Sequence, residues 1–121
     1  MKKLLLKGSK GSVIANALFD SGASHSFIKR EIAEKIEVLT KMPEPMDFST
    51  AEEGAKVFAT HCISIHFYIN NDRFGEMFYV IDNLAEDVII GAKTMQAYHF
   101  KLDFEKKEIT YPPEVTRFQI I

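Results

Sequence analysis

The sequence predicts one all-β, barrel-like domain with one or two short helices, spanning residues 1–121. A chain of 121 residues and 13.8 kDa has room for a single core. Ten Phe and four Tyr occur without any Trp, a composition that favours strands. The apolar runs are short and end in turn residues, and only two segments have a helical character.

The chain is expected to open with a hairpin. Gly8-Ser9-Lys10-Gly11 is typical turn sequence, and it separates the apolar runs Leu4–Leu6 and Ser12–Phe19. The second run ends abruptly at Asp20-Ser21-Gly22.

A short helix is expected next, within Phe27–Ile36. Its isoleucines fall four residues apart and share one face, with charged residues on the other: Ile28, Ile32 and Ile36. Pro43 and Pro45 are then expected to break the chain.

The middle of the chain predicts a long hairpin. Val57–Ile69 alternates between polar and apolar residues, which predicts a strand with one buried face: Ile63, Ile65, Phe67 and Ile69. Asn70–Arg73 reads as the turn, and Phe74–Ile81 as the returning strand.

The last third of the chain repeats this style on a smaller scale. Val88–Ile90 is a short buried strand that ends at Gly91, and Ala92–Tyr98 has room for one or two helical turns. Phe100–Phe104 and Ile109–Tyr111 then flank a charged tip and predict a final hairpin.

Asp20-Ser21-Gly22 is the strongest candidate site. An apolar strand delivers Asp20 into a tight turn, Ser21 can brace that turn through its hydroxyl, and Gly22 allows backbone to approach a ligand closely. Asp-Ser-Gly is also common turn sequence, so these three residues alone leave a purely structural turn open.

A second set of residues adds a family resemblance. Ala17–Ile28 resembles the active-site segment of retropepsin-like aspartic proteases, which include the proteases of retroviruses, long-terminal-repeat retrotransposons and their cellular relatives. Val88–Met95, two hydrophobic residues and a Gly before a short helix, is similar to the second signature of that family. Tyr98–Tyr111 resembles its closing hairpin, so that the resemblance covers roughly residues 12 to 111.

The resemblance implies a closed acid-protease barrel and assigns roles to several residues. Asp20 matches the catalytic aspartate, Ser21 the hydroxyl that braces the facing turn across a dimer axis, and Gly22 the residue whose backbone touches substrate. Ala23 matches the small residue that completes this loop, and Gly91 the glycine that packs beneath it.

The resemblance also implies a flap that covers the substrate. By position it lies at Phe48–Val57, with Glu53-Gly54 as its tip and substrate-binding residues.

One aspartate motif implies two chains. Hydrolysis by this chemistry needs one ionised carboxylate to take a proton from water and one protonated carboxyl to polarise the scissile carbonyl. The chain carries this motif once, at Asp20, so the resemblance implies an aspartic endopeptidase that is active as a two-fold homodimer, acts on extended peptides and needs no cofactor.

Some family features are missing. Many retroviral members carry an acidic residue at the position of Ser24 and an arginine at the position of Ala92, and the two side chains form an ion pair. Both residues are small here, so this ion pair is missing. Terminal strands, Lys3–Leu6 and Arg117–Ile121, are the expected replacement at the dimer interface. Pepsins usually have a hydroxyl residue at the position of Ala23, and that hydroxyl favours the ionised carboxylate. Ala23 has no hydroxyl, which predicts a weakly acid to neutral pH optimum.

Composition and spacing argue against other functions. A formal charge of −2 offers no footprint for nucleic acid or an anionic membrane, and Met1–Lys7 has too short an apolar run for a signal peptide, so a cytoplasmic location is expected. His61 and His66 have opposite strand parity, which argues against a metal site with Cys62. His25 adjoins Ser24 and Ser26 in sequence, which rarely gives triad geometry.

The remaining alternative is a non-catalytic or weakly active module of the same fold that dimerises or binds peptide. An intact Asp20-Ser21-Gly22 disfavours this reading.

Overall fold

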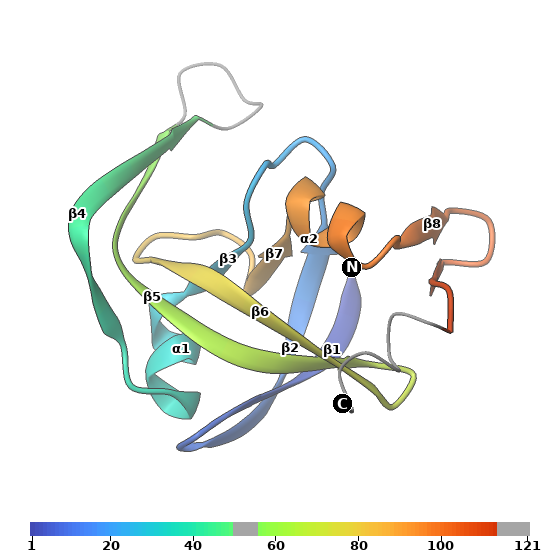
Figure 1. Cartoon of the computed structure of the whole chain (residues 1–121), viewed down its shortest axis with the longest axis horizontal. Coiled ribbons are helices and arrows are strands. Elements are labelled where there is room, and N and C mark those ends of the chain that lie inside the picture. The colour runs from blue at the N-terminus through green and yellow to red at the C-terminus, as the bar shows by residue number, and fades with distance from the viewer. Residues whose placement is uncertain (50–55, 114–121) are drawn as a thin grey trace.

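The computed structural model describes residues 1–49 and 56–113 (Figure 1). Within these ranges the chain forms strands and two short helices, as an all-β domain. The strands are β1 (Lys2–Gly8), β2 (Gly11–Phe19), β3 (Phe27–Lys29), β4 (Thr40–Ser49), β5 (Lys56–Ile69), β6 (Asp72–Ile81), β7 (Val88–Ile90), β8 (Lys101–Asp103) and β9 (Glu108–Thr110). The helices are α1 (Arg30–Ile36) and α2 (Ala92–Ala97).

Six strands close into a barrel. They follow the order β1-β2-β7-β3-β6-β5, and β1 pairs back onto β5 through Leu5–Lys7 to complete the ring. β4 continues the sheet beyond β5, outside the ring, and β8 with β9 forms a separate hairpin (Figure 1). The predicted closed, barrel-like fold is therefore confirmed.

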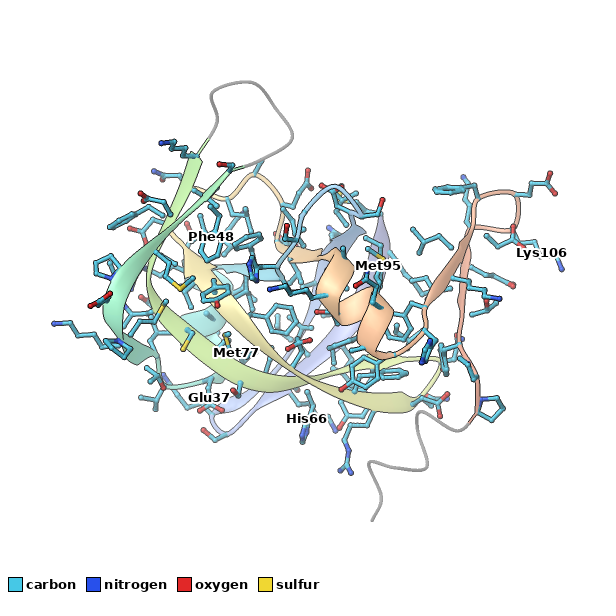
Figure 2. The ribbon with its side chains drawn as sticks, turned by 45° about the horizontal axis from the view of Figure 1, so that its top comes forward. Glu37, Phe48, His66, Met77, Met95 and Lys106 are labelled. Carbon is cyan, nitrogen blue, oxygen red and sulfur yellow. The ribbon has the colours of Figure 1, made fainter. Side chains whose placement is uncertain are left out.

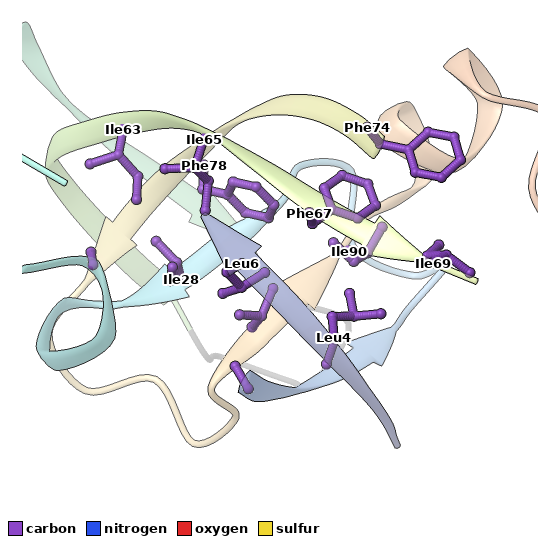
Figure 3. Packing of buried hydrophobic residues seen from close by; sticks show 14 of the residues in the cluster. Leu4, Leu6, Ile28, Ile63, Ile65, Phe67, Ile69, Phe74, Phe78 and Ile90 are labelled. Carbon is purple, nitrogen blue, oxygen red and sulfur yellow. The ribbon is translucent and has the colours of Figure 1, made fainter. Parts of the chain in front are cut away.

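The core follows from the alternation along β5. Its inward side chains are at most 4% exposed, and they meet aromatic side chains from the adjacent β6 (Figure 3). Phe67 stacks on Phe74 with ring centroids 5.4 Å apart, and Phe78 meets the edge of Phe67. Each such buried side chain contributes about 1.5–3 kcal/mol, so this hairpin supplies much of the stability of the barrel.

The expected helix begins later than its isoleucine spacing predicted. Phe27–Lys29 is strand β3 instead, because it pairs in parallel with β6 and antiparallel with β7. The prediction was wrong for Ile28, which is fully buried in this strand, and right for Ile36 at the end of α1. Hydrogen-bonded pairing with two neighbouring strands outweighs the helical spacing of the isoleucines here.

Pro43 and Pro45 do not end the strand, although they coincide with an interruption of its pairing, so the expected break is corrected only in part. Both lie inside β4, where the register with β5 shifts between Lys41 and Met46. β4 is an edge strand, so a residue without an N–H group interrupts no further ladder on its outer side.

The C-terminal hairpin is anchored to the barrel by a tyrosine. The Tyr111 hydroxyl bonds to the Asp72 carboxylate and lies 3.0 Å from the Ile69 carbonyl oxygen, while its ring packs against Phe74 and Phe100. Burial and the contact with Asp72 raise the pKa of Tyr111 to about 12. Burial also raises the pKa of Tyr98, whose ring packs against the same two phenylalanines.

Two expected segments fall outside the described residues, namely the flap tip Glu53-Gly54 and the terminal strand Arg117–Ile121. Neither helix in the described ranges is long and apolar enough to span a membrane.

Phe74→Ala is expected to lower the free energy of unfolding by about 3–5 kcal/mol, because the fully buried ring leaves a cavity among its aromatic neighbours. Phe104→Ala is the matched control, since that ring is 84% exposed, and should change stability by no more than about 0.5 kcal/mol. Urea denaturation at one fixed protein concentration measures both. Equal effects of the two variants would contradict the assigned core.

Alkaline pH should destabilise the fold through Tyr111. Its pKa is raised in the folded state, so between about pH 10 and 12 the unfolded chain binds fewer protons than the folded chain, and stability falls as pH rises. Tyr111→Phe should be less stable than the wild type at neutral pH, but its stability should fall less steeply between about pH 10 and 12. Tyr98, whose pKa is also raised, accounts for the fall that remains. Denaturation midpoints at pH 8 to 12 test this, and parallel curves for both proteins would contradict it.

Candidate functional site

Asp20 is the first residue beyond the ladder between β2 and β7. The two strands run parallel, with Leu18 opposite Ile89 and Phe19 opposite Ile90. The Asp20 amide then donates to the Ile90 carbonyl oxygen at 2.9 Å. The strand pairing therefore fixes the position of the Asp20 backbone at the end of the sheet.

The three residues after β2 form a tight turn around the Asp20 carboxylate. The Ala23 amide donates to the Asp20 carbonyl oxygen at 3.1 Å, and the Gly22 amide donates to Asp20 Oδ1 at 2.9 Å. Ser21 and Gly22 are exposed, whereas Asp20 is half-buried. A backbone amide of the turn thus orients the carboxylate, which lies at the surface of the domain.

The start of α2 packs directly beneath this turn. The Ala92 amide donates to the Ala23 carbonyl oxygen at 2.7 Å, and the Lys93 amide donates to the Ser24 carbonyl oxygen at 3.1 Å. A Cβ atom on Gly91 would lie 2.1 Å from the His25 carbonyl oxygen, so no larger residue fits without movement of the backbone. The two segments that resemble family signatures therefore contact each other through backbone.

A cleft of about 540 Å³ opens over the turn. One wall comes from the turn itself, the second from β4 and β5 and the third from the loop between β6 and β7. The lining includes Leu18, Asp20, Gly22, Ala23, Ser24, His25, Phe27, Asp47, Phe48, Ser49, Val57, Asn83, Leu84, Ala85, Glu86 and Ile89.

Aromatic rings support the cleft where β4 passes over the barrel. Phe48 is buried between β4 and the strands beneath it (Figure 2), with its ring centroid 5.1 Å from that of Phe27 and 4.6 Å from that of Tyr79. The His25 ring meets the edges of both Phe48 and Tyr79. Burial, and then the positive charge of Lys93, lowers the pKa of His25, which favours a neutral imidazole at pH 7.

Neither His25 nor Tyr79 was assigned a role at this site from the sequence, although His25 lies within the segment Ala17–Ile28. Nothing in the local sequence marks either one, because His25 follows the turn in a loop and Tyr79 lies on a strand almost 60 residues away. The parity of β6 was the available signal, since Tyr79 alternates with the core residues Phe78 and Val80.

The serine and histidine residues considered for a nucleophile or a metal site have other hydrogen-bond partners. Ser26 Oγ bonds to Thr94 Oγ1 and accepts from the Gly91 amide, and so is engaged away from His25. His61 Nδ1 bonds to the neighbouring Thr60 hydroxyl. Among the residues that the structure describes, no group of three or more His, Cys, Asp or Glu side chains is placed to hold a metal ion.

Comparison with known proteins places this geometry in a family. The family model for retroviral aspartyl protease matches residues 9–117. The fold is similar to the crystal structure of the retroviral protease-like domain of Ddi1 from Leishmania major, with a TM-score of 0.65 and 19% sequence identity over 92% of this chain and 87% of that chain. Because the family model spans most of the sequence, from the first hairpin past the last, this chain belongs to the retroviral aspartyl protease family.

Proposed function

We propose that this protein is an aspartic endopeptidase, in which a homodimer activates one water molecule between two Asp20 carboxylates. The observation that carries the proposal is the Asp20 turn, which forms one wall of the cleft in a chain of this family. An ionised carboxylate there takes a proton from water, and a protonated one polarises the peptide carbonyl.

The single chain supports half of this chemistry. Among the described residues, the other carboxylates of the cleft are Asp47 on β4 and Glu86 in the loop before β7, and neither belongs to the Asp20 turn. A second copy related by a two-fold axis would supply the missing group from an identical turn. Two carboxyl groups roughly 3 Å apart cannot both ionise. Instead they share one proton, which is the general behaviour of aspartic proteases.

Ser21 is the residue we assign to the contact between the two turns. Its side chain is exposed in the single chain and projects from the same turn as Asp20. A hydroxyl at this place can donate to the partner turn and hold the two carboxylates at a common distance. Ser24 and Ala92 supply no side-chain ion pair, and their backbone contacts join α2 to the turn within one chain.

The proposed substrate is an extended peptide. It would lie in the cleft between the Asp20 turn and the β4–β5 hairpin, where Gly22 allows close approach of its backbone. We assign the flap to Phe48–Val57, with Glu53-Gly54 as its tip.

Asp20→Asn should lower kcat by about 10²- to 10⁴-fold, because the amide can neither take nor share the proton. Asp103→Asn makes the same chemical change on the remote C-terminal hairpin and should keep full activity. Cleavage of a peptide library at pH 3 to 8 measures all three proteins. Undiminished cleavage by Asp20→Asn would exclude the mechanism. Self-association of all three proteins without cleavage by any would favour the non-catalytic module instead.

Mixing tests whether two chains share the site. In an excess of Asp20→Asn, most wild-type chains would sit in mixed dimers with one carboxylate, so activity per wild-type chain should fall well below its value alone. Asp103→Asn in the same excess should cause no loss. Activity that depends only on the number of wild-type chains would contradict a shared site.

The pH optimum is expected to be weakly acid to neutral, because Ala23 offers no hydroxyl to the carboxylate. Ala23→Ser should move the acid limb of the kcat/KM profile to lower pH, because the added hydroxyl can donate a hydrogen bond to the ionised carboxylate. Profiles of both proteins over the same pH range provide the measurement. A wild-type optimum near about pH 2 would refute this expectation.

A further inference from the structure

Two hydroxyl side chains lie buried beneath the Asp20 turn. Ser26 is 4% exposed and Thr94 is 2% exposed, and they are the buried polar residues of the described part of the chain. Burial of a hydroxyl costs free energy unless hydrogen bonds replace those lost to water. Their partners therefore identify what these side chains do.

The hydroxyls form a continuous chain of hydrogen bonds that crosses three elements. The Gly91 amide donates to Ser26 Oγ at 3.0 Å, Ser26 Oγ lies 2.7 Å from Thr94 Oγ1, and Thr94 Oγ1 donates to Glu76 Oε2 at 2.7 Å. The chain thus begins at the residue beneath the active-site turn and ends on β6. We call Ser26, Thr94 and Glu76 the hydroxyl relay.

The carboxylate sets the direction of every bond in this relay. An ionised Glu76 can only accept, so the single hydroxyl hydrogen of Thr94 points to it. Thr94 Oγ1 is then left as an acceptor, and Ser26 must donate to it. Ser26 Oγ in turn keeps its lone pairs for the Gly91 amide, so each hydrogen in the relay has one destination.

Glu76 occupies an unusual position for a carboxylate. On β6 it shares parity with Phe74, Phe78 and Val80, all of which are buried in the core. Its second oxygen is also fixed, since the Met77 amide donates to Oε1 at 2.7 Å. Glu76 itself is half-buried, and the hydrogen bonds to both of its carboxylate oxygens offset the cost of removing part of the charge from water.

We propose that Ser26, Thr94 and Glu76 are positioning residues for Asp20 in the reaction, an inference that rests on the proposed function. None of the three lines the cleft, so they can act only through the backbone that they hold. Gly91, whose amide donates to Ser26 of the relay, lies between Ile90 and Ala92, the two residues that bind the turn.

The mechanical path from the relay to the carboxylate is short. Ile90 precedes Gly91 and accepts the Asp20 amide at 2.9 Å, while Ala92 follows it and donates to the Ala23 carbonyl oxygen at 2.7 Å. A shift of the Gly91 peptide therefore moves both attachments of the turn together. Each chain of a dimer would carry its own copy, so a loosened relay would displace both carboxylates.

Thr94→Val is the most direct test, because valine has nearly the same shape and lacks only the hydroxyl. It should lower kcat by about ten- to hundredfold, the scale on which small misplacements of reacting groups act, and leave KM within about twofold. Thr94→Ser restores the hydroxyl and should recover most of kcat. Ile36→Val in the core at the end of α1 controls for a modest general loss of stability and should leave kcat unchanged.

Hydrogen exchange gives a second readout that needs no activity. Thr94→Val should raise the exchange rate of the Gly91, Asp20 and Ala23 amides by at least about fivefold relative to amides of the β5–β6 hairpin. The reason is that the buried Ser26 hydroxyl, which accepts from the Gly91 amide, loses its own acceptor at Thr94. Thr94→Ser and Ile36→Val should leave that ratio near its wild-type value.

The two readouts separate failure of this inference from failure of the proposed function. An active wild type whose kcat falls equally in Thr94→Val and Ile36→Val would overturn the positioning role. An inactive wild type would end the proposed function, and the exchange ratios would then decide whether the relay holds the turn. Unchanged ratios in Thr94→Val would overturn it in either case.

Discussion

The parallel ladder between β2 and β7 is the constraint on which the rest of this structure depends. It holds Asp20 at the end of the sheet through the Ile90 carbonyl oxygen. Parallel neighbours need a long crossover, and here the crossover comprises β3, α1, β4, β5 and β6. The same segment closes the barrel and supplies two walls of the cleft, so the strand pairing that positions the carboxylate also surrounds it.

The Asp20 turn lies at the boundary between two differently packed regions. The main core, built around the β5–β6 hairpin, extends to Ile90 (Figure 3). It also includes Met95 of α2. A smaller cluster of Phe27, Phe48, Ala59, Ile81 and Leu84 lies under the cleft, with Ala23 and Ile89 packed against it. Backbone hydrogen bonds hold the turn between these two regions, and its half-buried carboxylate stays accessible from the cleft.

Much of the fold could be predicted because its signals are local. The alternation of Ile63, Ile65, Phe67 and Ile69 requires one buried strand face whatever that strand pairs with, and the turn residues on either side mark the ends of the hairpins. The errors arose where pairing partners outweighed local preference. Phe27–Lys29 became a strand because β6 and β7 flank it, and Pro43 and Pro45 were accepted because their strand lies at a sheet edge.

The sequence by itself determined the all-β class, the strand that ends at Asp20, the Asp20-Ser21-Gly22 turn and the glycine that follows Val88–Ile90, since each depends on the order of neighbouring residues. Only the tertiary structure decided that Gly91 lies against His25, that Phe48 and Tyr79 enclose the imidazole, and that Ser26, Thr94 and Glu76 share one chain of hydrogen bonds. These contacts join residues 18 to 68 positions apart in the sequence. Which side chains face one another depends on the strand register, and composition and spacing do not encode that register.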